Sequence, residues 1–171
     1  QELRASAQQS WEANLFKPAG IGRGSEHSHQ PQIRSDSILW LDWQKPELAP
    51  FEKFLEGLKI ELNQQLMLGI QAFEAHLARY AEGQFYQEHL DQPRAQSFLH
   101  GERLISFVLY LNRDWVEGDG GELQIRDTDG KLQLIQPRWG NLVLFDSKTI
   151  LHQVLPSKRD RWSLTGWFRR S

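Results

Sequence analysis

The spacing of apolar residues from residue 72 onward constrains the fold more than any other feature of this sequence. Apolar and polar side chains alternate there in short segments, which are separated by turn residues such as Asp119-Gly120-Gly121 and Asp129-Gly130. A period of two is typical of β-strands, and Asp-Gly between two such segments favours a tight hairpin. The alternation predicts strands over residues 72–80, 85–90, 103–111, 122–125, 131–135, 141–145, 150–155 and 161–168.

The residues before this region carry helical and loop signals instead. Residues 2–13 are rich in good helix formers, and apolar residues repeat at helical spacing from Phe51 to Leu66, with Gly69 as a stop. Between these two helical segments, residues 15–32 combine glycines and prolines with little apolar mass. Such a composition predicts a long mobile loop.

Together these patterns predict one domain over residues 1–171. We expect the helices and the mobile loop to occupy about residues 1–71, and a mainly β core to occupy about residues 72–171. Many short strands after a helical segment are typical of an antiparallel barrel or a jelly roll, with the helices packed on its outside.

Composition narrows the possible functions. The formal net charge of −2 provides no broad basic field, so nucleic acid and anionic membranes are disfavoured as partners. Because the chain has no cysteine, disulfides, thiolate metal sites and cysteine nucleophiles are excluded, and any metal must be bound by histidine and carboxylate. No apolar run is long enough to span a bilayer, and residues 1–10 are too polar for a signal peptide, so we expect a soluble cytoplasmic protein.

Three residues form a candidate metal site. His89 and Asp91 are two residues apart on an expected strand, so their side chains can point at one ion, and His152 on a later strand is a candidate third ligand. Two histidines and one carboxylate on one face of an octahedron leave three positions open, as Fe(II) oxygenases require. A His-x-Asp pair by itself also fits a surface or core role, so this interpretation depends on the residues downstream.

Arg161 is the downstream residue that matters most. Alternation along the last strand places Arg161, Ser163, Thr165 and Trp167 on one face, and Trp162, Leu164 and Phe168 on the other. A planar guanidinium binds a carboxylate through two parallel hydrogen bonds, so this face suits one end of a diacid. The alternative is a surface arginine, since residues 158–161 form a charged turn.

Several ordered motifs resemble the prolyl hydroxylase branch of the 2-oxoglutarate oxygenases, in particular the bacterial relatives of the oxygen-sensing prolyl hydroxylases. They are Tyr80-Ala-Glu-Gly-Gln-Phe-Tyr-Gln-Glu-His89-Leu-Asp91, Arg103-Leu-Ile-Ser-Phe-Val-Leu-Tyr110-Leu-Asn-Arg-Asp-Trp115, Gly120-Gly121-Glu-Leu, and His152 through Arg161 to Trp167. Upstream, the segment 34–40 extends the resemblance. The resemblance implies a double-stranded β-helix (jelly-roll) core flanked by helices.

The resemblance also implies roles for individual residues. It implies that His89, Asp91 and His152 are iron ligands and that Arg161 anchors the co-substrate. Further positions resemble residues that support the co-substrate (Tyr110, Thr165 and Tyr80), residues that line the substrate entrance (Arg103 and Trp167), and the family's Arg-Gly-Asp motif near the substrate (Arg34 and Asp36, with Ser35 in place of glycine). The implied cofactor is Fe(II), with 2-oxoglutarate and O₂ as co-substrates and ascorbate as an additional candidate.

Other histidines have less direct interpretations. His76 shares the predicted face of Tyr80 and is either a core histidine or part of the site. His27 and His29 lie on the expected mobile loop, where exposure to solvent is favoured over metal binding. In the family this loop folds over an extended substrate peptide.

The activity implied by the resemblance is oxidative decarboxylation of 2-oxoglutarate to succinate and CO₂, coupled to hydroxylation of a prolyl residue in a protein. The substrate suggested for the bacterial branch is elongation factor Tu. The carboxylate of Asp91 argues for hydroxylation, because related halogenating enzymes have glycine or alanine there. Alternatives are oxidation of another amino acid or a small molecule on the same core, and a non-catalytic jelly-roll binding module. A nucleic-acid demethylase is disfavoured, since those relatives carry a second arginine in their terminal motif.

Overall fold

The computed structural model describes residues 2–21, 28–92, 101–127 and 129–170. Within them the elements are α1 (Glu2–Glu12), β1 (Lys17–Pro18), β2 (Ser37–Trp40), a 3₁₀ turn (Pro46–Leu48), α2 (Ala49–Leu66), β3 (Ala72–Tyr80), β4 (Tyr86–His89), β5 (Glu102–Tyr110), β6 (Leu123–Arg126), β7 (Leu132–Ile135), β8 (Leu142–Asp146), β9 (Leu151–Val154) and β10 (Arg161–Arg170). The predicted class, mainly β with N-terminal helices, is confirmed.

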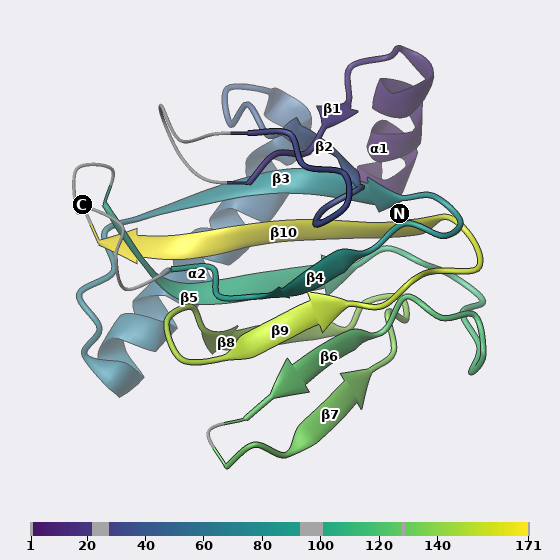
Figure 1. The fold of residues 1–171 in the computed structure, drawn as a ribbon. Helices are drawn as coiled ribbons and strands as arrows, with labels where there is room; N and C mark the ends of the chain where they lie inside the picture. The colour runs from purple at the N-terminus through teal and green to yellow at the C-terminus, as the bar shows by residue number, and fades with distance from the viewer. Residues whose placement is uncertain (1, 22–27, 93–100, 128, 171) are drawn as a thin grey trace.

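The strands form two antiparallel sheets (Figure 1). The larger sheet has the order β1-β2-β3-β10-β5-β8, and the smaller sheet has the order β4-β9-β6-β7. In both sheets strands that are distant in sequence lie next to each other, as in a jelly roll. The helices α1 and α2 lie on the side of the larger sheet that faces away from the smaller one.

The last strand, β10, organises the molecule because it lies between β3 and β5 and presents two different faces. Its even-numbered residues Trp162, Leu164 and Phe168 are buried in a hydrophobic cluster that includes Leu55 of α2. Arg161, Ser163, Thr165 and Trp167 face the cavity on the opposite side, so the predicted alternation is confirmed. Gly166 is required by close packing, because a Cβ there would lie 2.3 Å from the Glu74 carbonyl oxygen and 2.4 Å from the Phe107 ring.

The eight strands predicted from alternation all form, with ends that differ from the prediction by at most two residues. The strands β1 and β2 were not predicted, because Ser37–Trp40 places Ile38 and Leu39 next to each other instead of alternating apolar and polar residues. Pairing with β3 makes this segment a strand, with Leu39 opposite Leu77. Tertiary context therefore decides the structure here.

The expected loop at residues 15–32 is only partly described, since residues 22–27 lie outside the described residues. Its flanks are held in place: Ile21 and Ser28 form a two-way backbone bridge with N···O distances of 2.9 Å. No helix in the described parts of the chain is both long enough and apolar enough to cross a membrane.

Candidate active site

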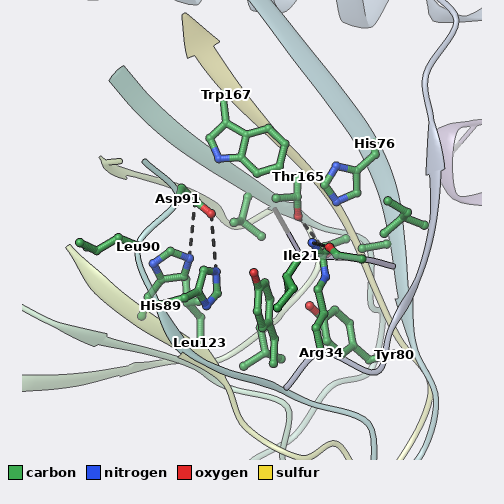
Figure 2. A pocket seen from close by; sticks show the side chains of 18 of the residues that line it. Ile21, Arg34, His76, Tyr80, His89, Leu90, Asp91, Leu123, Thr165 and Trp167 are labelled. Carbon is green, nitrogen blue, oxygen red and sulfur yellow. Dashed lines mark hydrogen bonds and ion pairs between the residues drawn. The ribbon is translucent and has the colours of Figure 1, made fainter. Parts of the chain in front are cut away.

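A cavity of about 330 Å³ lies between the two sheets (Figure 2). Most residues that the sequence singled out line it: Arg34, His76, Tyr80, His89, Asp91, Arg103, His152, Arg161, Thr165 and Trp167. Two predicted residues are not among the lining residues. Tyr110 packs against Arg161, with the guanidinium carbon 5.1 Å from the ring centroid, and Asp36 is buried behind Arg34.

His89, Asp91 and His152 converge on one point at the side of this cavity. Their candidate ligand atoms all lie within 4.8 Å of one another. His89 ends β4 and lies opposite His152 of β9 in register. Asp91 is not on the strand as predicted, because β4 ends at His89 and Asp91 lies in a bend two residues later. The three side chains still meet, so the expected metal-binding set is present in geometry.

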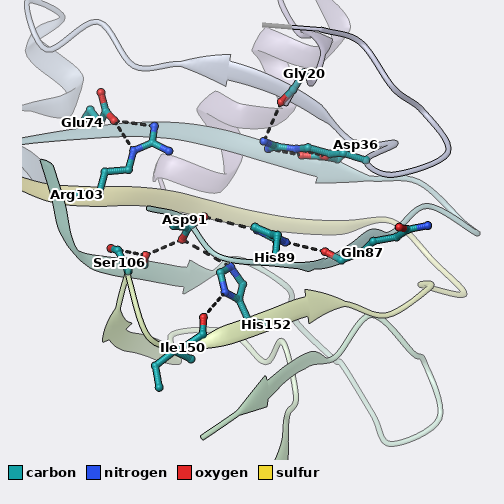
Figure 3. Close-up of polar contacts among 12 residues, drawn as sticks. Gly20, Asp36, Glu74, Gln87, His89, Asp91, Arg103, Ser106, Ile150 and His152 are labelled. Atoms are coloured by element: carbon teal, nitrogen blue, oxygen red, sulfur yellow. Dashed lines mark hydrogen bonds and ion pairs between the residues drawn. The ribbon is translucent and has the colours of Figure 1, made fainter. Parts of the chain in front are cut away.

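Each of the three residues is oriented by a neighbour (Figure 3). The Nδ1 atoms of the two histidines lie 2.7 Å and 3.1 Å from the carbonyl oxygens of Gln87 and Ile150, respectively. Because a carbonyl can only accept, Nδ1 carries the proton and Nε2 keeps its lone pair for a metal. The Ser106 hydroxyl donates to Asp91 Oδ2 at 2.6 Å, and it also lies 2.8 Å from the Ser147 hydroxyl.

The electrostatics of this group favour metal binding. Burial lowers the pKa of His152 to about 4, so its imidazole is neutral at physiological pH. Burial acts to raise the pKa of Asp91, but His152, His89 and the Ser106 hydroxyl together hold this pKa well below its ordinary value. Neutral imidazoles and an ionised carboxylate are the protonation states that ligate a divalent metal. A hard set of two nitrogens and one oxygen with open positions fits Fe(II).

Arg161 is one of three arginines among the described residues that line the cavity. The residue is 1% exposed, and its Nε donates to the Gly121 carbonyl oxygen at 2.8 Å. Its guanidinium carbon lies 5.0 Å from the Tyr80 ring centroid. No carboxylate of the described residues forms an ion pair with it, which is unusual for a buried guanidinium. The arrangement can therefore receive an anion from outside the chain.

Hydroxyl groups surround Arg161. The Tyr110 hydroxyl is buried and has no hydrogen-bond partner among the described residues. Burial raises the pKa of Tyr110 despite the nearby Arg161, so the phenol stays protonated and can donate. Ser163 and Thr165 follow on the same face of β10, with their hydroxyl oxygens 3.4 Å apart. Such donors around a guanidinium suit a carboxylate.

The predicted entrance residues form two separate contacts. Arg103 stacks on Trp167, with its guanidinium carbon 3.3 Å from the ring centroid, and its Nη2 bonds to Glu74 at 2.8 Å. Arg34 makes a two-point contact with Asp36 at 2.8 Å and 3.1 Å. Arg34 is thereby held at the cavity, where it also reaches the Gly20 carbonyl oxygen at 3.4 Å.

Sequence reasoning missed three residues of the site. Tyr86 stacks on the ring of His89 at 3.6 Å, Trp40 lines the cavity, and Ser106 supports Asp91. Tyr86 could not be predicted from alternation, because the strand register is irregular between Tyr86 and His89. Ser106 could have been found, because it lies four residues before Tyr110 and so shares its face of the strand.

Comparison with known proteins gives matches along most of the chain. A family model described as the 2OG-Fe(II) oxygenase superfamily matches residues 75–169. Egl nine homolog 1 from Rattus norvegicus is 27% identical over 148 residues, which is 80% of this chain and 41% of that protein. Prolyl 3-hydroxylase OGFOD1 from Mus musculus is 41% identical over 80 residues, which is 41% of this chain and 14% of that protein. The chain thus spans less than half the length of these curated relatives.

Two solved structures share the fold. A Pseudomonas putida prolyl-4-hydroxylase has a TM-score of 0.87 at 37% identity, covering 98% of this chain and 84% of that one. A prolyl hydroxylase from Trichoplax adhaerens, solved with a hypoxia inducible factor peptide, has a TM-score of 0.85 at 24% identity, covering 98% and 76%. The expected double-stranded β-helix is confirmed by these matches.

Proposed function

The chain belongs to the 2OG-Fe(II) oxygenase superfamily, and on this premise we propose that it hydroxylates a prolyl residue in a protein substrate. As a dioxygenase of this superfamily it uses Fe(II) with 2-oxoglutarate and O₂ as co-substrates. Succinate and CO₂ are the proposed co-products. The buried Arg161, with no carboxylate partner among the described residues, carries the proposal because it provides for a co-substrate anion.

In this proposal His89, Asp91 and His152 hold the iron. The facing Nε2 atoms and the ionised carboxylate make a compact set on one side of the cavity, which supports the assignment. Iron bound there supplies the activation of O₂ that couples 2-oxoglutarate decarboxylation to substrate hydroxylation. The protein positions the reactants and excludes water from them.

Arg161 is the proposed partner of the far carboxylate of 2-oxoglutarate. Its guanidinium forms charge-assisted hydrogen bonds, and the Tyr110 and Thr165 hydroxyls add donors to the same anion. The ring of Tyr80 packs beside the Arg161 guanidinium, and both residues are almost fully buried. Burial around the anchor strengthens these interactions, because few water molecules compete for the anion.

The proposed substrate is a protein, and elongation factor Tu is the first candidate. Trp40 and Trp167 form an aromatic surface at the cavity, against which a prolyl ring can pack. The similarity to prolyl hydroxylases over nearly the full chain supports proline as the target.

The test combines the purified protein with Fe(II), 2-oxoglutarate and elongation factor Tu from the native host. We expect mass spectrometry to find one added oxygen on a proline, with an equal amount of succinate. The same incubation with the Asp91→Ala variant is the control. Hydroxylation of a residue other than proline, or succinate release that no protein from the host stimulates, would contradict the proposal.

A further inference from the structure

His76 is a buried histidine in the middle of β3 that has no part in iron or 2-oxoglutarate binding as described above. It is 1% exposed and lines the cavity. Figure 2 shows its ring beside Thr165 and close to Trp167, with the ring nitrogens on the side that faces Thr165. Neither Nδ1 nor Nε2 has a hydrogen-bond partner in the described part of the chain.

A buried imidazole without hydrogen-bond partners stabilises the core less than an apolar side chain would. Burying a polar group without a partner is destabilising, whereas an apolar side chain of similar size carries no such cost. A buried polar atom without a partner needs an explanation, and in a binding cavity a ligand can supply the partner. The position therefore indicates a role that requires hydrogen bonding.

The charge state of His76 defines what it can bind. Burial, Arg34 and Arg103 all lower the pKa of His76, and Asp91 acts in the opposite direction, with a pKa well below the ordinary value as the result. A neutral imidazole has one N–H donor and one acceptor nitrogen. The ring consequently suits an uncharged polar group better than an anion.

Register places His76 away from Arg161. On β3, Tyr80 lies opposite Arg161, whereas His76 lies four residues earlier, opposite Thr165. On its other side His76 lies opposite Trp40 of β2. His76 thus belongs to the part of the cavity that β2 and β3 form.

Two tryptophans make this side suitable for a prolyl ring. Trp40 meets the His76 ring edge to face at 5.0 Å, and Trp167 lies 5.4 Å from it. Because proline has no amide N–H, its own backbone offers only a carbonyl oxygen, and the residue before it adds another. Within this aromatic surface, the imidazole N–H of His76 is a donor that matches such an oxygen.

We propose that His76 binds the peptide substrate, donating a hydrogen bond to a backbone carbonyl oxygen beside the target proline; this role rests on the proposed prolyl hydroxylation. Trp40 is 50% exposed, and its ring centroid lies 5.0 Å from that of His76. Both ring nitrogens of His76 are inaccessible to solvent. Binding of the peptide therefore requires a side chain beside His76 to move.

The test compares His76→Leu with His76→Gln, which have similar volumes but differ in hydrogen bonding. The substrate is elongation factor Tu, or whichever host protein gains oxygen on proline. For His76→Leu we expect KM for this substrate to rise about tenfold, the effect of one lost hydrogen bond. His76→Gln should restore most of the loss. Anaerobic binding of 2-oxoglutarate with Mn(II) should stay within about twofold of wild type in both variants.

Thermal unfolding separates a contact from a packing role. His76→Leu should unfold at the same or a higher temperature than wild type, because it removes an unpaired polar group. An unchanged KM in His76→Leu, or equal losses in both variants with lowered unfolding temperatures, would overturn the contact. A loss confined to 2-oxoglutarate binding would overturn it as well. Absence of hydroxyproline with the wild-type enzyme would instead overturn the proposed function and the contact with it.

Discussion

The two sides of the cavity differ in how well their polar groups are satisfied by the protein itself. On the metal side, each histidine is held by a backbone carbonyl, and Asp91 accepts from Ser106. On the side of Arg161 and His76, a buried guanidinium has no carboxylate in the described residues, and neither the Tyr110 hydroxyl nor the His76 ring has a partner among them. The metal side is preorganised, whereas the other side is completed only when organic ligands bind.

The largest effect that tests this contrast is expected for Asp91→Ala. The change removes the anionic ligand of three, so Mn(II) binding followed by electron paramagnetic resonance should weaken by more than about a hundredfold, and hydroxylation should fall to background. Glu61→Ala, at an exposed carboxylate on α2, is the matched control. Near wild-type turnover in Asp91→Ala would contradict the assignment of the metal side.

Arg161→Ala should separate the two sides. It leaves the far carboxylate of 2-oxoglutarate desolvated and unpaired, so binding of 2-oxoglutarate should weaken by about 2 to 5 kcal/mol. Mn(II) binding should change little. Anaerobic titration measures both, with Arg138→Ala at an exposed arginine as control. Equal losses of metal and 2-oxoglutarate would show that the two sides are not independent.

Tyr110→Phe should weaken 2-oxoglutarate binding by roughly 1.5 to 3 kcal/mol, the value of one hydrogen bond to a charged group. Thr165→Val should have an effect of similar size. The free protein carrying Tyr110→Phe should be at least as stable as wild type, because the lost hydroxyl has no partner among the described residues. Denaturant unfolding without ligand, combined with titration, checks both halves of this prediction.

Ser106→Ala, unlike Tyr110→Phe, is expected to lower the stability of the free protein. It removes a donor to Asp91 and a contact of Ser147, so the metal-free protein should lose about 1 kcal/mol of stability. Metal affinity should fall about tenfold, as is usual for groups that orient a ligand. If Ser106→Ala stabilised the metal-free protein, the hydrogen bonds of the metal side would not be what holds Asp91 in place before metal binds.

The smallest effect concerns Glu74, which bonds to Arg103 and Arg169. Burial acts to raise the pKa of Glu74, but the two arginines outweigh it and lower this pKa. A carboxylate whose pKa is lower in the folded than in the unfolded state stabilises the fold at pH values above its unfolded-state pKa. This stabilisation disappears as the pH falls through the folded-state pKa. Glu74→Gln should therefore cost about 1 kcal/mol at pH 7 and nearly nothing at the lowest pH where the protein still folds. Denaturant unfolding of wild type and Glu74→Gln from pH 7 down to the lowest pH where both still fold tests this prediction; a stability difference that does not change with pH would contradict it.

The sequence predicted the parts of the molecule where the backbone is regular. Alternation along β10 placed Arg161 and Trp162 on opposite faces, as the structure has them. It left a surface position open for Arg161, and the family resemblance was needed to place this residue in the site. Alternation failed where the backbone is irregular: Asp91 lies beyond the end of β4, and the neighbouring register shift hid Tyr86. Here the metal-binding set was still recognised, because the spacing of its residue types resembles a family.

Pairings between distant segments could not be read from the sequence. Trp40 meets His76 only because β2 pairs with β3, and no local pattern marks Ser37–Trp40 as a strand. Whether His76 was a core histidine or a site residue also depended on its missing partners, which only three-dimensional packing reveals. Local propensity carries no information about such contacts.

The division of β10 into two faces has a practical consequence for enzyme engineering. From Arg161 to Phe168 its odd-numbered positions face the cavity, and its even-numbered positions belong to the hydrophobic cluster or, at Gly166, pack against Phe107. A library that randomises Ser163 and Thr165 while it fixes their even-numbered neighbours would explore new co-substrates without disturbing the hydrophobic cluster. A single-residue insertion in the same strand would exchange the two faces, so substitution is the only practical way to diversify this segment.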